Sequence, residues 1–200
     1  KSQLKKESLT FKSLTLNDRQ LCDIEMLLNG GFSPLVGFLG QSDYESVLKN
    51  NRLSDGTVWP MPITLDVSED FSKELNSGEK VVLRDHEGVA IGVLNLTDKW
   101  SPNLKEEAEQ VYGSSDTTHP AVDYLLNKSG SVYLGGQIEG LEYPRHYDYQ
   151  LMRHTPSELR SQFEKMGWSK VVAFQTRNPM HRAHKELVVR ASKEIGGNLL

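Results

Sequence analysis

Residues 171–184 read Val171-Val172-Ala173-Phe174-Gln175-Thr176-Arg177-Asn178-Pro179-Met180-His181-Arg182-Ala183-His184. A short apolar run passes through a polar loop into a helical pattern, an order typical of an α/β fold. The N-terminus of such a helix offers unpaired N–H groups and a partial positive charge to an anion. Here the loop adds a guanidinium, two amides and a hydroxyl, and the helix begins with two imidazoles. The stretch therefore predicts an anion or nucleotide site.

The spacing of the two histidines places them on one face of the predicted helix. His181 and His184 are three residues apart, which makes them neighbours on a helix surface. The same face continues through apolar residues, with Leu187 beside it: Val188, Ala191 and Ile195. Because this pattern is typical of a core-facing side, we expect the imidazoles at the crevice beyond the strand ends, where ligands bind in open α/β sheets.

The elements around this stretch predict the opening of a Rossmann-like sheet. A helix should begin at Thr155-Pro156-Ser157-Glu158, which reads as a capping box with proline at the first helical position, and end near Gly167. A strand over 170–174, a helix over 181–195 and a strand over 198–200 follow, with Gly196-Gly197 ending the helix. Since one or two parallel strands cannot bury both faces, we expect the protein to continue beyond residue 200.

The first part of the chain predicts a compact, β-rich α+β domain. Asn17 is a suitable N-cap for a helix that ends at Gly30-Gly31. Further helices are expected over 43–49, 105–112 and 120–127, and strands over 63–67, 80–84, 89–96 and 131–138. The polar and aromatic segment 141–154 shows no clear periodicity, and we place the domain boundary within it, between residues 148 and 149.

Composition narrows the classes of function. The net charge of −4 argues against a broad basic surface for nucleic acid, so anionic ligands would depend on local groups such as those of residues 175–185. No apolar run approaches the roughly 18 residues of a membrane span. Cys22 is the only cysteine, which excludes an internal disulfide and favours a reducing, cytoplasmic setting.

The run from Gln175 to His184 closely resembles the signature of the ATP sulfurylase (sulfate adenylyltransferase) family. Three further segments resemble that family's N-terminal domain: Asn29-Gly30-Gly31-Phe32-Ser33-Pro34-Leu35 with Gly37-Phe38-Leu39, Arg52-Leu53-Ser54-Asp55-Gly56-Thr57, and Pro144-Arg145-His146-Tyr147-Asp148-Tyr149. The resemblance implies a mixed α/β protein with a PUA-like β-barrel over residues 1–148. The beginning of a Rossmann-like nucleotidyltransferase domain would follow over residues 149–200.

The reaction implied by the resemblance is ATP plus sulfate to adenosine 5′-phosphosulfate plus pyrophosphate, by direct attack of sulfate on the α-phosphate. By chemistry, Arg177 is the planar fork for sulfate and Gln175 can donate an amide N–H to the same anion. The resemblance likewise places Gln175 and Arg177 at sulfate. It makes Thr176, Arg177 and Asn178 catalytic, and His181 and His184 stabilise the transition state. It places all six of these residues around ATP.

The remaining expectations concern the metal ion, the oligomeric state, the partners and the activity of this segment. Magnesium would arrive with ATP, since no carboxylate cluster indicates a protein-built metal site. We expect a homo-oligomer at full length, no nucleic-acid or membrane partner, and little or no activity from these 200 residues alone.

Three alternatives stay open on sequence grounds. The first is another nucleotidyltransferase that uses His-x-x-His with a carbon-based phosphate acceptor, although Arg177 and Gln175 favour a small oxyanion. The second is a zinc site on His181 and His184, which lacks further ligands at a suggestive spacing. The third is an RNA-binding module, because PUA-like domains often bind RNA.

Overall fold

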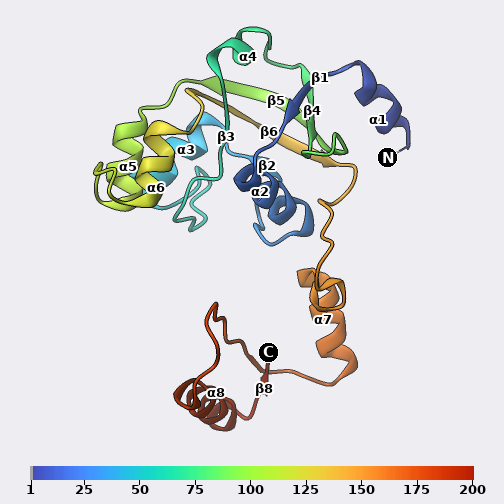
Figure 1. Ribbon diagram of the computed structural model, residues 1–200, viewed down its shortest axis with the longest axis vertical. Helices are drawn as coiled ribbons and strands as arrows, with labels where there is room; N and C mark the ends of the chain where they lie inside the picture. The colour runs from blue at the N-terminus through green and yellow to red at the C-terminus, as the bar shows by residue number, and fades with distance from the viewer. Residues whose placement is uncertain (1) are drawn as a thin grey trace. The chain divides into compact units, whose positions relative to one another are not determined.

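The computed structural model describes residues 2–200. The chain divides into two compact units, one ending at Tyr147 and the other comprising Asp148–Leu200 (Figure 1). The boundary between residues 148 and 149, which the sequence analysis placed between the two family domains, stays a prediction. In the part of the chain that the structure describes, no helix is long and apolar enough to cross a membrane.

A six-stranded sheet forms the centre of the first unit. Its strands are β1 (Lys12–Thr15), β2 (Gly37–Phe38), β3 (Leu65–Val67), β4 (Lys80–Arg84), β5 (Ala90–Trp100) and β6 (Val132–Gly140). The strand order is β1-β4-β5-β6-β2, and β3 pairs with β6 as well. The β1–β4 pair is parallel and the others are antiparallel, with β3 and β2 pairing successive parts of β6.

The expected barrel is not closed. Among the described strand pairs, β1 contacts only β4 at one edge, and β2 and β3 lie at the other edge along β6. These two edge strands are two and three residues long, too short to carry a sheet round to β1. The first unit is therefore an open, mixed sheet with helices packed on it.

Alternating side chains of β4 and β5 bury both faces of the sheet. Val81 and Leu83 lie in a core shared with α2 (Asp18–Asn29), whereas Val82 between them lies in a separate cluster on the other face. Leu4 and Phe11, near α1 (Ser2–Glu7) and the 3-10 helix η1 (Ser8–Thr10), pack against that second cluster. This two-residue alternation is what a pleated strand covered on both sides requires.

Close backbone contacts fix where β2 meets β6. A Cβ atom at Gly37 would lie 2.0 Å from the carbonyl oxygen of Gly136, and Gly136 itself has φ of 155°. Only glycine tolerates both the approach and the backbone conformation.

Helices gather at one end of the sheet. They are α3 (Gln41–Asn50), α5 (Leu104–Tyr112) and α6 (Pro120–Asn127), whereas α4 (Glu69–Lys73) follows β3. Figure 1 shows α3, α5 and α6 together beside one end of the sheet, with α1 beyond the other. The expected helix after Asn17 is confirmed as α2: Asn17 Oδ1 accepts the Gln20 N–H at 3.0 Å, Gln20 Oε1 accepts the Asn17 N–H, and Gly30 ends the helix with φ of 82°.

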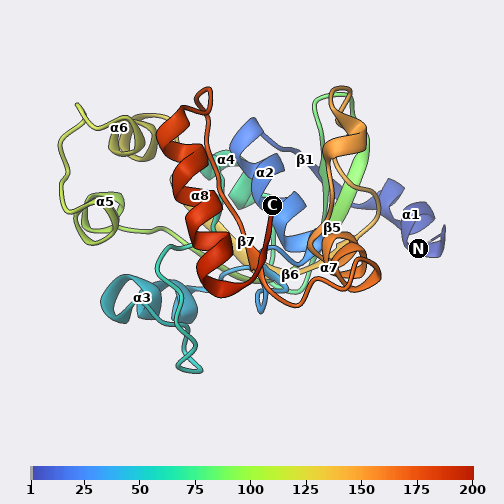
Figure 2. The ribbon, with the colours of Figure 1, turned by 90° about the horizontal axis from the view of Figure 1, so that it is seen from below.

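The second unit contains one parallel strand pair, two α-helices and a short 3-10 helix. After the 3-10 helix η2 (Gln150–Met152), α7 (Pro156–Lys165) begins with the expected capping box of Thr155 and Glu158. The strands β7 (Val171–Val172) and β8 (Asn198–Leu199) pair in parallel with each other, and α8 (Arg182–Ile195) connects them along the chain. Figure 2 shows α8 alongside β7 within this unit. Strand, helix and parallel strand form the β–α–β connection that the sequence predicted.

Candidate functional site

The strand–loop–helix stretch is held at both ends. Backbone bonds between β7 and β8 extend from Lys170, whose carbonyl accepts the Asn198 N–H at 2.9 Å, to Phe174, whose N–H reaches Leu200 O at 3.1 Å. At the other end α8 begins after His181, which is its N-cap residue. The loop therefore leaves a paired strand and enters the N-terminus of a fourteen-residue helix, as the sequence indicated.

Thr176 and Asn178 shape this loop. The Thr176 hydroxyl donates to the carbonyl of Asn178 at 3.0 Å and accepts that residue's N–H at 3.1 Å. The hydroxyl is thus committed to a local turn of the kind serine and threonine often form. The turn positions the side chains on either side of it, a role that the sequence did not reveal.

The two histidines lie together at the beginning of α8. Their ring centroids are 5.6 Å apart with an interplanar angle of 71°, and His184 Nδ1 accepts the backbone N–H of His181 at 3.3 Å. The ring of His184 also packs on Phe174, with 5.5 Å between centroids. His184 is half-buried and held from two sides, whereas His181 is exposed.

The loop's other polar side chains are open to solvent. Gln175 and Arg177 are exposed, and neither forms a hydrogen bond or ion pair with any residue that the structure describes. Their donors are therefore free for a ligand, while Thr176 and Asn178 are partly engaged with each other. The structure brings the histidines together at the helix N-terminus, whereas no hydrogen bond among the described residues joins Arg177 to them.

The expected core-facing stripe of α8 is confirmed only in part. Val188 is 7% exposed and Ala191 is half-buried, in line with His184. Leu187 and Ile195 were placed in or beside the stripe by the sequence, and this is wrong: they are 61% and 40% exposed. Two strands give α8 a narrow surface to pack on, so only the centre of its apolar face is covered.

Positive charge is concentrated near this loop. Arg177, Arg182 and Lys185 are exposed, and the nearest acidic side chain along the helix, Glu186, is paired with Arg190 at 2.7 Å. An anion at the beginning of α8 would meet these cations as well as the helix dipole. Residues 2–200 contain no group of three or more His, Cys, Asp or Glu side chains arranged to hold a metal ion, so His181 and His184 have no third ligand for zinc.

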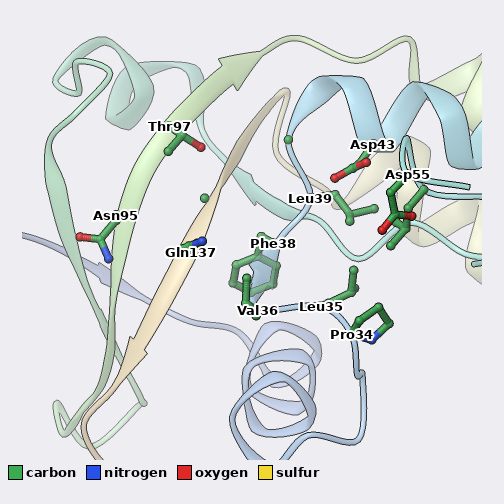
Figure 3. A pocket seen from close by; sticks show the side chains of 14 residues that line it. Pro34, Leu35, Val36, Phe38, Leu39, Asp43, Asp55, Asn95, Thr97 and Gln137 are labelled. Atoms are coloured by element: carbon green, nitrogen blue, oxygen red, sulfur yellow. The ribbon is translucent and has the colours of Figure 1, made fainter. Parts of the chain in front are cut away.

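A cavity in the first unit has the opposite chemistry. It has a volume of about 500 Å³ and lies between the segment around β2 and the strands β5 and β6 (Figure 3). Its two charged side chains, Asp43 and Asp55, are both acidic, and the other polar ones are neutral: Asn95, Thr97 and Gln137. With no cationic group in its lining, this cavity is unsuited to sulfate or the phosphates of ATP.

Comparisons with known proteins agree with this division of the chain. Residues 1–143 match a PUA-like domain family and residues 150–200 match the ATP-sulfurylase family. The sulfate adenylyltransferase of Schizosaccharomyces pombe is 48% identical over 202 residues, covering 100% of this chain and 41% of that protein. The sulfate adenylyltransferase of Saccharomyces cerevisiae is 50% identical over 185 residues, covering 92% of this chain and 36% of that protein.

A solved structure shares the fold. The hexameric APS kinase from Thiobacillus denitrificans superposes with a TM-score of 0.80 at 34% sequence identity, covering 99% of this chain and 35% of that chain. The chain thus spans well under half the length of the relatives it matches. It belongs to the ATP sulfurylase family, of which it carries the N-terminal PUA-like domain and the beginning of the ATP-sulfurylase domain.

Proposed function

We propose that this chain is the N-terminal part of a sulfate adenylyltransferase, in which the loop before α8 binds the reacting anions. The observation that carries the proposal is the free donor set of Gln175 and Arg177 beside two paired imidazoles at a helix N-terminus. The relatives' name, sulfate adenylyltransferase, supports the proposed reaction, in which ATP plus sulfate gives adenosine 5′-phosphosulfate plus pyrophosphate.

The chemistry explains why cations and amides suffice. A sulfate oxygen forms a bond to the α-phosphorus of ATP as the bond from that phosphorus to the bridging oxygen breaks, and pyrophosphate leaves in line. Sulfate is already an anion, so no general base is needed. The barrier comes from bringing two anions together and from charge that develops on the leaving oxygen, which positioned donors can stabilise.

Each side chain has a role that follows from its donors. Arg177 offers a planar, permanently charged fork to sulfate, and Gln175 adds an amide N–H. Thr176 and Asn178 hold the loop and offer polar contacts to the nucleotide. His181 and the Nε2 side of His184 stabilise the negative charge on the phosphates.

The proposal also covers the metal, the oligomeric state, the location and the partners of the full-length protein. Magnesium is expected to enter as its ATP complex, and no protein-bound metal is proposed. We also propose that the full-length protein is a homo-oligomer, an expectation supported by the hexameric neighbour. The lone Cys22 favours a cytoplasmic setting, and the proposed partners are ATP, sulfate and their products, with neither nucleic acid nor membrane among them.

The test compares two arginine variants in the full-length protein. Arg177→Ala should abolish sulfate-dependent pyrophosphate release from ATP, because an exposed loop guanidinium contributes little to packing and much to the anion. Arg190→Ala removes another exposed arginine, whose ion pair among the described residues is with Glu186, and should leave turnover unchanged. Equal activity in the two variants would overturn the site assignment.

The same assay separates the alternative nucleotidyltransferase. That enzyme would release pyrophosphate with a carbon-based phosphate acceptor and would not respond to sulfate. Sulfate dependence of the wild-type rate therefore decides between the two reactions.

A further inference from the structure

A second cavity lies in the first unit beneath the α5–α6 pair. It has a volume of about 210 Å³, and its walls come from α2, the segment before β3, α5, α6 and β6. At about 30 Å³ for each water molecule in the liquid, it has room for about seven waters or one small organic molecule. It shares no lining residue with the acidic cavity of Figure 3, and all its lining residues belong to the first unit.

A buried carboxylate lines this cavity. Glu107, on α5, is only 5% exposed, and its Oε2 atom accepts hydrogen bonds from Tyr44 and Tyr133, both at 2.9 Å. Its other oxygen, Oε1, accepts no hydrogen bond from any residue that the structure describes. Oε1 is not among the buried polar atoms that lack a partner, so solvent reaches it, and a donor that enters the cavity lined by Glu107 can reach it as well.

The surroundings of Glu107 are short of positive charge. Arg19 on α2 pairs with both Asp23, at 2.6 Å, and Asp66, so one guanidinium serves two carboxylates. Burial raises the pKa of Glu107, and it raises the pKa of Asp23 in spite of the neighbouring Arg19. When Glu107 is ionised, three carboxylates share a single arginine, and a cationic ligand would reduce this excess of negative charge.

The walls favour an organic cation. Residues 2–200 hold no cluster of three or more carboxylate, imidazole or thiolate ligands for a metal ion. Besides the charged side chains of Arg19, Asp23 and Glu107, the lining is mostly aliphatic and aromatic and includes Met61, Ile63, Val111, Tyr112, Tyr124 and Leu125. Aliphatic groups suit a hydrocarbon body. The Tyr124 ring already has the guanidinium of Arg19 over its face, 5.9 Å from the centroid, so the Glu107 carboxylate is the group that attracts a ligand cation.

From this arrangement we propose that the cavity binds a small primary ammonium compound, with its nitrogen donating to Glu107 Oε1 and its hydrocarbon body against the apolar wall. Its lining includes no residue of the loop before α8, so the test of this site does not depend on the sulfate chemistry. The ligand class is defined by one cationic head and a body of about four carbons, the size that a cavity of about seven waters admits.

The test titrates the 200-residue chain with n-butylammonium chloride and follows backbone amide signals by NMR. Signals of Val111, Tyr112 and Ser129, which line the cavity, should shift in a saturable way, while sodium chloride at equal ionic strength should not move them. 1-Butanol, which has the same body without the charge, should bind at least about tenfold more weakly. Equal affinity for the two probes, or no saturable shift with butylammonium, overturns the proposal.

Two variants assign the effect to this cavity. Glu107→Gln should weaken butylammonium binding at least about tenfold, whereas Glu109→Gln, an exposed change on the same helix, should not. Should the glutamine at 107 fail to fold, Ala121→Leu decides the matter, since it places a larger side chain in the cavity and leaves Glu107 intact. Binding that survives Ala121→Leu would overturn the proposal.

Discussion

The Nδ1 atom of His184 lies 3.3 Å from the backbone nitrogen of His181 and accepts its N–H. An accepting Nδ1 in a neutral imidazole leaves the ring proton on Nε2. The ring is held on its other side by Phe174, so its direction is fixed from both the helix and the strand. His184 is thereby oriented as a hydrogen-bond donor at the beginning of α8.

This orientation predicts different effects of two substitutions at position 184 in the full-length enzyme. Asn can accept the His181 N–H in place of Nδ1 but cannot reach the place of Nε2, so kcat should fall by about 10²-fold, as for loss of a transition-state donor. Gln, whose amide reaches as far as Nε2, should retain more activity although it caps the helix less well. Equal kcat for the two variants, measured by pyrophosphate release, would contradict a donor role for Nε2.

The isolated 200-residue chain should be nearly inactive, although it carries the whole loop. It spans 41% of the Schizosaccharomyces pombe relative, and β7 and β8 form only a two-stranded sheet. Without the remaining groups the reactants are not held in line, a loss that can exceed about 10⁵-fold in rate. Turnover of this chain and of the full-length protein should be compared in one assay, with circular dichroism to confirm folding. A rate for the short chain within tenfold of the full-length rate would show that the site is misplaced.

The sequence predicted those features that depend on neighbouring residues. The N-cap of α2 at Asn17, its end at Gly30, the capping box of α7 and the β7–loop–α8 order all follow from short contiguous signals. β1 was missed because Lys12-Ser13-Leu14-Thr15 has little apolar alternation, and its strand form comes from pairing with β4, more than sixty residues away. The barrel was wrong because no local signal says whether two sheet edges meet.

The same division holds for the sites. Gln175 to His184 could be recognised because ten contiguous residues carry the chemistry. The cavity at Glu107 could not be recognised, because the residues that donate hydrogen bonds to Glu107 are distant in sequence. Tyr44 is 63 residues away and Tyr133 is 26 residues away. A site assembled by the fold from distant elements leaves no spacing to read.

The N-cap of α2 predicts a measurable loss of stability in the first unit. Asn17→Ala removes the acceptor for the Gln20 N–H and should cost about 1 kcal/mol, which lowers Tm by about 2–4 °C. Asn17→Ser keeps a capping oxygen and loses only the contact from the Asn17 amide to the Tyr124 hydroxyl at 3.2 Å, so it is the matched control. If the serine and alanine variants have the same Tm in a thermal scan, the cap is not what stabilises this helix.

Glu107 predicts a pH dependence of stability. Burial raises the pKa of this carboxyl above its ordinary value of 4.5, although the phenols of Tyr44 and Tyr133 oppose the shift. Above pH 4.5 the folded state therefore holds a proton that the unfolded chain has released. The free energy of unfolding that comes from this group is complete below that pH and is lost as the pH rises through the folded-state pKa.

Glu107→Gln should remove this dependence, because the amide does not titrate. The free energy of unfolding of the variant should fall less than that of the wild type as pH rises from about 4 to 8, measured by urea unfolding at each pH. Asp23, whose pKa burial also raises, is present in both proteins and cancels in the comparison. Glu109→Gln changes an exposed carboxyl of the same helix and should follow the wild-type profile. Parallel profiles for wild type and Glu107→Gln would mean that the pKa of Glu107 is the same in the folded and unfolded states, and would contradict the upward shift caused by burial.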